Sequence, residues 1–478
     1  MYDWRGCVIA RATMPVNGRI AIYLPAVFVQ LSSMDFVRKV RSALSVSFSA
    51  LASALEARRR RRILSPRMAG ALALAVLAAS GCQHGKSAGT AVAELPAGKP
   101  AYVDYGKSEQ TIRGFGGTSA WVSDFSSSQA DTLFGTGSGE MGLSILRVRI
   151  DPGGADDWDT ELNNAQQAET RGATVIATAW SPPAFMKDND RVMGGSLAPD
   201  SYTAYAAYLE SFVKYMASVG VNLYGVSLQN EPDTANPDES CIWTPEQMDR
   251  WIADNAETLS TRLIVPESRN FSASYADQIL NDPKAAAHVA IIAGHLYGVA
   301  PTPYPAAVKA GKEVWMTEHY LPGTGISGAL ALAKEIHDSL TQADYSAYLW
   351  RWIENYPAGR YSSGLMDGTG NITLNGYAMG QFSRFVRPGY VRSPATANPN
   401  PGVYVSAYKG SGHWVIVAIN LGSSAVRQPF VIQHAAIKSM TPFETTVNET
   451  IAGLSTMGVA NDSFSYVLPA KSIVTFVN

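Results

Sequence analysis

Eight short apolar runs, separated by helix-like segments, are the feature of this sequence that most constrains its fold. They cover Gly114–Ala120, Ile145–Asp151, Thr174–Trp180, Leu223–Gln229, Leu263–Glu267, Val289–Leu296, Glu313–Glu318 and Ser346–Trp352. Several are almost continuously apolar, which is typical of parallel strands covered on both faces. The intervening segments Tyr202–Ala217, Thr244–Leu259 and Ala329–Leu340 have helical periodicity, with Pro245 as a first helical residue. Eight strand–helix units in about 240 residues predict a (β/α)8 TIM barrel, whose active site lies at the carboxyl ends of the strands.

The main alternative is a doubly wound open sheet that binds a nucleotide. Such a sheet normally carries a glycine-rich phosphate loop after a strand. The run Gly114-Phe-Gly-Gly117 has neither of the required spacings. The barrel is therefore the favoured prediction.

A second kind of pattern follows the barrel. Short alternating strands are expected at Val403–Tyr408, Trp414–Ile419, Phe464–Leu468 and Ile473–Val477, which predicts an antiparallel β-sandwich side domain. The segment before the barrel, Ala101–Ile112, can add an N-terminal strand to it. The predicted division is 101–113 for the strands of the side domain, 114–384 for the catalytic barrel and 385–478 for the β-sandwich.

The amino terminus has the order of an export signal. Five arginines at 58–62 precede an apolar run of about a dozen residues, shorter than the roughly 20 of a membrane-spanning helix. The run ends in Ala79-Ser-Gly-Cys82, which resembles the lipobox of a bacterial lipoprotein, although Leu is more usual at its first position. We predict a signal peptide at 68–82, lipidation of Cys82 and a flexible tether at 83–100, after a mis-assigned or disordered extension at 1–67.

This signal predicts an exported protein, anchored by lipid at the periplasmic or cell-surface side of a membrane. The alternative is an ordinary secretory signal cleaved nearby, which would make the protein secreted and Cys82 an incidental thiol.

Charge and composition exclude several classes of partner and cofactor. Lys and Arg total 38 against 40 for Asp and Glu, so no basic field exists for nucleic acid. Three cysteines cannot build a disulfide framework. The seven histidines lack the close spacing of zinc-ligand motifs, so we expect neither a metal nor another cofactor.

Two glutamates end opposing predicted strands. Glu231 follows the fourth strand in Gln229-Asn-Glu-Pro-Asp233, and Glu318 ends the seventh in Trp315-Met-Thr-Glu318. Glycosidic bond cleavage needs an acid for the leaving oxygen and a second carboxylate that attacks the anomeric carbon or activates water. A single glutamate at a strand end is more often structural, but a pair at the rim of one barrel indicates a glycosidase.

Aromatic residues near the same strand ends support a carbohydrate cleft. Trp180, Trp243, Trp315, Trp350 and Trp352 could stack on sugar rings, although each alone is more often a core residue. Asn230 could hydrogen-bond a sugar hydroxyl.

The sequence resembles glycoside hydrolase family 30, especially its bacterial xylanase branch, from about Ala101 to Asn478. The motifs are Ile112-Arg-Gly-Phe-Gly-Gly117, Ser144-Ile-Leu-Arg147, Gln229-Asn-Glu-Pro-Asp233, His295-Leu-Tyr297, Trp315-Met-Thr-Glu318 and Phe385-Val-Arg-Pro-Gly-Tyr-Val-Arg392. The resemblance implies a barrel fused to a β-sandwich and a retaining mechanism with Glu231 as acid/base and Glu318 as nucleophile. It also implies sugar-binding roles for Trp180, Asn230, His295 and Tyr297, with a hydrogen-bonded core histidine as the alternative for His295.

The retaining mechanism carries two further expectations. The carboxyl groups should lie about 5–5.5 Å apart. Burial and the neighbouring negative charge should raise the pKa of Glu231, so that it can protonate the leaving group.

The sequence departs from the glucuronoxylanases of that family after the eighth strand. Those enzymes carry arginine there to pair with the glucuronate branch of xylan, whereas Glu354 and Asn355 stand here. Arg360 could substitute from a new position. The loop after the third strand, from Ser181–Lys187 to Gly194–Leu197, resembles the branches that cleave glucan and glucosylceramide more than the xylanase branch.

The function predicted from the sequence is that of a monomeric endo-β-1,4-xylanase that does not depend on glucuronate. The alternatives are a β-glucan or β-glucosidic hydrolase (β-1,6-glucanase or glucosylceramidase-like) on the same scaffold, and a surface lipoprotein that binds polysaccharide without cleaving it.

Overall fold

The computed structural model describes residues 95–355 and 363–478. The predicted extension at 1–67, the signal with Cys82, residues 83–94 of the predicted tether and Arg360 lie outside these residues. None of the helices in the described residues has the length and apolar character needed to cross a membrane.

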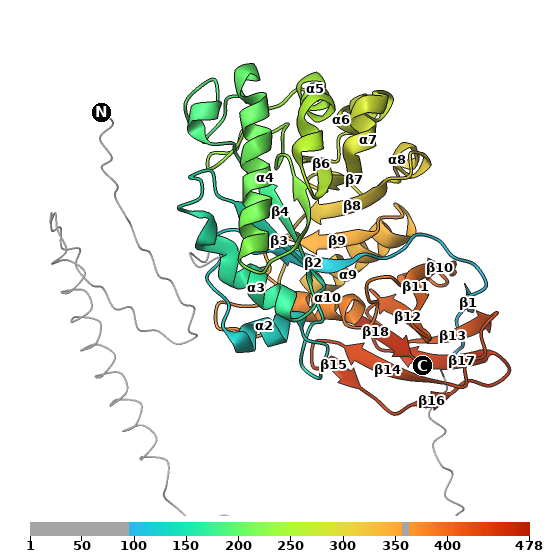
Figure 1. Cartoon of the computed structure of the whole chain (residues 1–478). Coiled ribbons are helices and arrows are strands. Elements are labelled where there is room, and N and C mark those ends of the chain that lie inside the picture. The colour runs from blue at the N-terminus through green and yellow to red at the C-terminus, as the bar shows by residue number, and fades with distance from the viewer. Residues whose placement is uncertain (1–94, 356–362) are drawn as a thin grey trace, which may run out of the picture. The chain divides into compact units, whose positions relative to one another are not determined.

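Eight parallel strands close into a barrel within residues 95–355 (Figure 1). They are β2 (Gly114–Thr118), β3 (Ile145–Ile150), β4 (Thr174–Ala179), β5 (Leu223–Ser227), β6 (Arg262–Ser268), β7 (Val289–His295), β8 (Glu313–Glu318) and β9 (Ala347–Trp350). Each pairs with its neighbours in sequence, and β9 closes the ring by pairing with β2. The predicted barrel is confirmed, and every strand lies within two residues of its expected bounds.

Helices surround the barrel on its outer side (Figure 1). The α-helices among the described residues are α2 (Ser127–Phe134), α3 (Leu162–Thr170), α4 (Tyr202–Ser218), α5 (Pro245–Asn255), α6 (Ala273–Asn281), α7 (Pro283–His288), α8 (Pro305–Lys309), α9 (Gly325–Thr341) and α10 (Leu374–Ser383). Pro245 is the first residue of α5, as predicted, and Thr244 caps that helix by accepting a hydrogen bond from the Gln247 N–H.

The C-terminal part forms two sheets, drawn in orange and red in Figure 1 except for one blue strand that residues 101–104 contribute. One sheet has the order β10 (Val391–Ser393), β11 (Val403–Gly410), β12 (His413–Asn420), β18 (Ser472–Val477), β14 (Ser439–Thr445), β15 (Thr450–Gly453), with β16 (Met457–Gly458) paired to β14. The other has the order β1 (Ala101–Asp104), β13 (Val426–Gln433), β17 (Ser463–Leu468). The predicted side domain and its completion by an N-terminal strand are confirmed. The strands β10, β13, β14, β15 and β16 were not predicted.

The side domain packs on the barrel through α9 and α10. Thr475 on β18 donates a 2.7 Å hydrogen bond to the carbonyl oxygen of Gln381 on α10, and the Gln381 side chain donates to Thr445 on β14. The His337 ring on α9 packs edge-on against Tyr404 on β11. These contacts hold the barrel and the side domain together through buried groups of both.

The barrel interior changes character along its length. Its amino-terminal end is filled by apolar side chains, namely Ile145, Ile176, Ile264, Ile291, Ala293, Trp315, Ala347 and Leu349. Toward the carboxyl ends of the same strands the buried side chains are charged or polar, with Arg147, Glu267, His295 and Glu318 at most 1% exposed. Buried charges require partners, so this end of the barrel holds the candidate functional groups.

Candidate active site

Glu231 and Glu318 face one cavity at the carboxyl ends of the strands. Glu231 follows β5 and Glu318 is the last residue of β8. Both side chains line the walls of a cavity of about 390 Å³, and one carboxylate oxygen of each lies within 4.8 Å of the other. That proximity suits direct attack on a carbon held between them better than the 6.5–9.5 Å gap of an inverting pair.

Three donors hold Glu318. Arg147 Nη1 donates to its Oε2 over 2.8 Å, and Arg351 Nη1 donates to its Oε1 over 2.8 Å. The Tyr297 hydroxyl donates to the same Oε1 over 3.0 Å. Burial raises the pKa of Glu318, but the charges of Arg351, His295 and Arg147 lower it below its ordinary value. Glu318 is thus kept ionised, as a nucleophile must be.

Glu231 has a separate set of partners. Asn236 Nδ2 donates to its Oε2 over 2.9 Å, Arg269 Nη1 approaches the same oxygen at 3.2 Å, and His295 Nδ1 lies 3.3 Å from its Oε1. Burial raises the pKa of Glu231, but His295, Asn236 and Arg269 lower it to about 2. The expected raised pKa is therefore wrong for the free site, because donors from distant parts of the chain outweigh burial.

His295 lies close to both carboxylates. Its ring is fully buried at the end of β7, and Nδ1 lies 3.3 Å from Glu231 and 3.8 Å from Glu318. Burial lowers the pKa of His295, but Glu318, Glu231 and Glu267 raise it to about 9. A proton missing from Glu231 is therefore held on the adjacent imidazole, so Glu231 and His295 titrate as a pair.

A buried arginine is hydrogen-bonded to several residues of the site. Arg147, in the middle of β3, donates to Asn230 Oδ1 over 2.8 Å besides Glu318, and its Nε donates to Glu267 over 3.1 Å. The guanidinium also lies 4.5 Å from the centre of the Trp180 ring. Asn230, predicted to contact sugar, is 2% exposed, is not among the residues that line the cavity and accepts a hydrogen bond from this arginine.

The aromatic predictions divide into two groups. Trp180, Tyr297 and Trp352 line the cavity, together with Trp121 and Tyr320. Trp121 and Trp180 pack edge to face at 5.2 Å, and Tyr320 stacks on Trp352. These rings surround the acids, where faces of sugar rings could stack.

The sugar-stacking prediction is wrong for the other three tryptophans. Trp243 is packed in the core between Tyr202, Tyr205 and Trp251, and Trp350 is 1% exposed with its Nε1 donating to the Ser363 carbonyl. Trp315 lies in the apolar end of the barrel, stacked on Tyr224.

The residues at the predicted glucuronate position lie outside the cavity lining. Glu354 is 7% exposed and Asn355 accepts a 2.8 Å hydrogen bond from the Gly364 N–H, which fixes the start of the loop after β9. Neither is among the residues that line the cavity.

Among the described residues, one group could hold a metal ion by geometry: Glu231, His295 and Glu318. Arg147, Arg351 and Arg269 are already bonded to its two carboxylates. A cation would have to displace these arginines, so the donor set fits proton chemistry better than metal binding.

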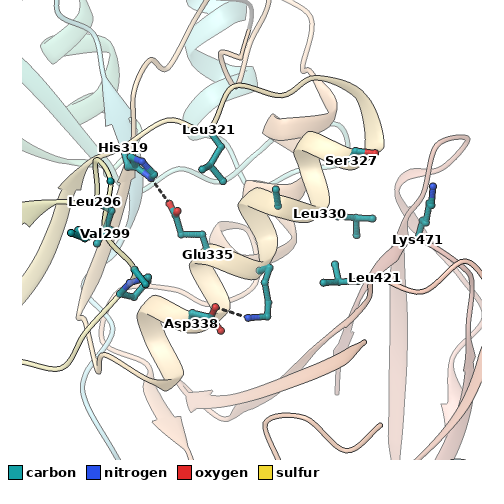
Figure 2. Close-up of a pocket in the computed structure, with 15 residues that line it drawn as sticks. Leu296, Val299, His319, Leu321, Ser327, Leu330, Glu335, Asp338, Leu421 and Lys471 are labelled. Atoms are coloured by element: carbon teal, nitrogen blue, oxygen red, sulfur yellow. Dashed lines mark hydrogen bonds and ion pairs between the residues drawn. The ribbon is translucent and has the colours of Figure 1, made fainter. Parts of the chain in front are cut away.

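A second hollow, of about 730 Å³, lies between α9, the loops after β7 and β8, and the side domain (Figure 2). Its apolar lining includes Leu296, Val299, Leu321, Leu330 and Leu421, and His319 pairs with Glu335 across 2.8 Å. The His319 ring packs edge-on against Tyr297, so the two cavities lie back to back. Neither catalytic candidate lines this hollow, which leaves the cavity of Glu231 and Glu318 as the candidate active site.

Several residues of the site were not assigned a role from the sequence: Trp121, Arg147, Glu267, Arg269, Tyr320 and Arg351. One signal was available, because Arg147 and Glu267 each interrupt an apolar strand and a buried charge needs a partner. The sequence does not identify that partner, since Arg147 and Glu267 are 120 residues apart.

Comparison with known proteins places these observations in a family. Residues 157–356 match the model of the glycosyl hydrolase family 30 TIM-barrel domain. The glucuronoxylanase XynC of Bacillus subtilis is 40% identical over 405 residues, covering 81% of this chain and 94% of the relative.

Solved structures agree. The family 30 subfamily 8 xylanase Xyn30A of Clostridium acetobutylicum is 42% identical with a TM-score of 0.75, covering 79% of this chain and 99% of that one. A family 30 endoxylanase of Clostridium papyrosolvens is 40% identical with a TM-score of 0.72, over the same shares of both chains.

Proposed function

Because the chain belongs to glycoside hydrolase family 30, we propose that it is an endo-β-1,4-xylanase that cleaves xylan with retention at the anomeric carbon. The observation that carries this function is the pair of buried carboxylates, Glu231 and Glu318, within 4.8 Å of each other in a cavity walled by aromatic rings. The three relatives described above, which are 40–42% identical and match over nearly their whole length, are xylanases.

In the first step Glu318 attacks the anomeric carbon and forms a glycosyl ester. Arg147, Arg351 and Tyr297 keep its carboxylate ionised and aimed. The leaving oxygen needs a proton from Glu231, which in the free site is ionised beside a protonated His295. Transfer from His295 Nδ1 to Glu231 Oε1, across 3.3 Å, supplies that proton and leaves a neutral imidazole.

In the second step Glu231 is a base. Esterification removes the negative charge of Glu318, and Glu231 has become a carboxylate by giving up its proton. It can then take a proton from the water that attacks the ester. Asn236 and Arg269 stabilise the carboxylate form that this step requires.

Glucuronate independence is part of the proposal. Positions 354 and 355 hold Glu and Asn, and the two arginines in the described cavity wall, Arg269 and Arg351, are already paired with Glu231 and Glu318. We therefore expect kcat/KM on linear or arabinose-substituted xylan to lie within about threefold of that on glucuronoxylan.

The test is product analysis on xylans with and without glucuronate branches, with β-1,6-glucan as a comparison. The first anomer seen by proton NMR should be the β form, and products should be oligosaccharides. A preference of more than about tenfold for glucuronoxylan would contradict glucuronate independence. Cleavage of β-1,6-glucan without cleavage of xylan would overturn the xylanase proposal, and binding of xylan without hydrolysis would favour a polysaccharide-binding lipoprotein.

Export, lipidation at Cys82 and a monomeric state complete the proposal. The support is the arginine-led apolar run that ends at Cys82. Labelled palmitate should enter the full chain expressed in a bacterium and should be absent from the Cys82→Ala variant. Light scattering of residues 95–478 should give the mass of one chain, and a dimer mass would contradict the monomer.

A further inference from the structure

We propose that Glu267 is a positioning residue that holds both catalytic glutamates in place, one through Arg147 and the other through His295. The inference rests on the proposed hydrolase function. Glu267 does not line the cavity and is fully buried near the end of β6. Any effect it has on the reaction must therefore pass through the residues that it contacts.

The first link is to the nucleophile. Arg147 Nε and Nη2 donate to the two oxygens of Glu267 over 3.1 and 3.2 Å, which fixes the plane of the guanidinium. The remaining nitrogen, Nη1, donates to Glu318 over 2.8 Å. Thr178 donates a further 3.0 Å hydrogen bond to Glu267 Oε2 and fixes the carboxylate itself. The orientation of Glu318 thus depends on Glu267.

The second link is to the acid/base. His295 Nε2 has no hydrogen-bond partner among the described residues and lies 3.8 Å from Glu267 Oε1, while Nδ1 faces Glu231. The backbone adds a direct connection, because the Glu231 N–H donates to the Glu267 carbonyl oxygen over 3.0 Å. Glu267 is therefore in contact with the backbone of Glu231 and with the ring that touches its side chain.

Charge balance explains why a third carboxylate is buried here. Arg147, Arg351 and a protonated His295 bring three positive charges to the buried part of the site, and Glu231 and Glu318 supply only two negative ones. Arg269 adds a positive charge beside Glu231, but its side chain is 45% exposed and solvent screens it. Stability alone does not explain a buried ion pair at this position. Apolar packing fills the other end of the same strands, and such packing is often as stable as a buried ion pair. Glu267 supplies the missing charge without entering the cavity.

The protonation of His295 follows from all the charged and titratable groups around it. These are Glu231 after β5, Glu267 on β6, Tyr297 after β7 and Glu318 on β8. Three arginines are bonded to the same carboxylates: Arg147 on β3, Arg269 after β6 and Arg351 after β9. Removing the charge of Glu267 leaves His295 with two carboxylates instead of three. The Glu231–His295 pair then loses its proton at lower pH, and the enzyme loses its acid earlier as the pH rises.

The test compares Glu267→Gln, which removes the charge, with Glu267→Asp, which keeps the charge but retracts it. Glu210→Gln is the matched control, because Glu210 is also buried but binds the Ser260 N–H on the outside of the barrel. Thermal unfolding and circular dichroism establish that each variant folds. The readouts are the pH profile of kcat/KM on xylan and the titration of histidines labelled with carbon-13 in the ring.

Glu267→Gln should lower kcat about 100-fold and move the alkaline limb down by about one pH unit. Glu267→Asp should also lower kcat but leave that limb in place, and Glu210→Gln should leave both unchanged. In the labelled protein the His295 signal, identified by its absence in His295→Gln, should titrate at lower pH in Glu267→Gln.

Two outcomes would overturn the proposal. One is a Glu267→Gln profile of unchanged shape together with an unchanged His295 titration. The other, which applies even if Glu267→Gln does not fold, is a Glu267→Asp variant with the kcat of the unmodified enzyme. A wild-type protein inactive on xylan would refute the proposed function instead, and the His295 titration would still report whether Glu267 controls that ring.

Discussion

The two ends of the barrel interior are built on the same strands from opposite kinds of side chain. On β3, Ile145 belongs to the apolar part and Arg147, in the middle of the strand, to the charged part. On β6 the corresponding residues are Ile264 and Glu267. On β8, Trp315 lies in the apolar end and Glu318 in the charged end.

The difference teaches where stability and activity come from. The apolar end is stabilised by removing its side chains from water, at roughly 25 cal/mol per Å² of apolar surface. The charged end is costly to bury and persists because each charge has partners of the opposite sign. Substitutions at one end should therefore change stability, and those at the other should change catalysis, even on a single strand.

The largest expected effect comes from β8. Glu318→Ala removes the nucleophile and should lower kcat on xylan by at least about 10⁴-fold. Glu313→Ala, at the other end of the same strand, should leave kcat unchanged, because Glu313 is paired with Arg113 and Trp315 away from the cavity. Steady-state kinetics on the two purified variants makes the comparison, and equal losses in both would show that the strand, not the carboxylate, was disturbed.

The next effect is on stability. Trp315→Ala empties a site where the indole is 1% exposed and stacked on Tyr224. We expect the free energy of unfolding to fall by about 3–5 kcal/mol, while kcat per folded molecule stays the same. Urea unfolding with active-site titration measures both quantities. A lower kcat in the folded fraction would show that the two ends are mechanically coupled.

The contrast also separates what the sequence could reveal from what it could not. The barrel strands were located because an apolar run of strand length is a local signal. Strand β13 was missed because its sequence, Val426-Arg-Gln-Pro-Phe-Val-Ile-Gln433, carries Pro429 and polar residues that weaken the alternation. The division into barrel and side domain depended on the same local signals.

The candidate site was predicted only in part. Glu231 and Glu318 could be placed because a strand end in a barrel has a known location, and the family resemblance supplied their roles. The surroundings of Glu231 could not be predicted from the sequence. His295 and Arg269 contact it from 64 and 38 residues away, and they reverse the expected shift of its pKa. Trp243 and Trp350 were misplaced because sequence position does not fix which way an indole ring points.

A third, smaller effect is the pH dependence of stability, which should originate at the charged end. The pKa of Glu231 is lowered from 4.5 to about 2, so its stabilisation is present above pH 4.5 and is lost as the pH falls toward 2. The pKa of His295 is raised from 6.5 to about 9, so its contribution is present below pH 6.5 and is lost as the pH rises through 9. The free energy of unfolding should therefore be greatest between pH 4.5 and pH 6.5, where both contributions are present.

Melting temperatures measured from pH 2.5 to 9.5 test whether the pH dependence of stability originates at the charged end. Glu231→Gln should make the acid side of the curve less steep, because one titrating carboxylate is gone while Glu318, whose pKa is also lowered, remains. Trp315→Ala should lower the curve by the same amount at every pH. An acid side that is unchanged in Glu231→Gln would place the titration elsewhere in the molecule.

The smallest effect is expected where the charged end meets solvent. Arg269 contacts Glu231, but its side chain is 45% exposed, so water and salt screen the interaction. Arg269→Ala removes a charge that favours the carboxylate, so the Glu231–His295 pair should keep its proton to higher pH. The alkaline limb of kcat/KM should rise by less than about one pH unit, and the shift should shrink in 0.5 M salt as screening increases. Arg262→Ala is the matched control at the start of β6, the strand that Arg269 directly follows, because Arg262 lies over the Tyr224 ring at the apolar end. If both variants moved the limb equally, the shift would reflect the net charge of the protein rather than the contact with Glu231.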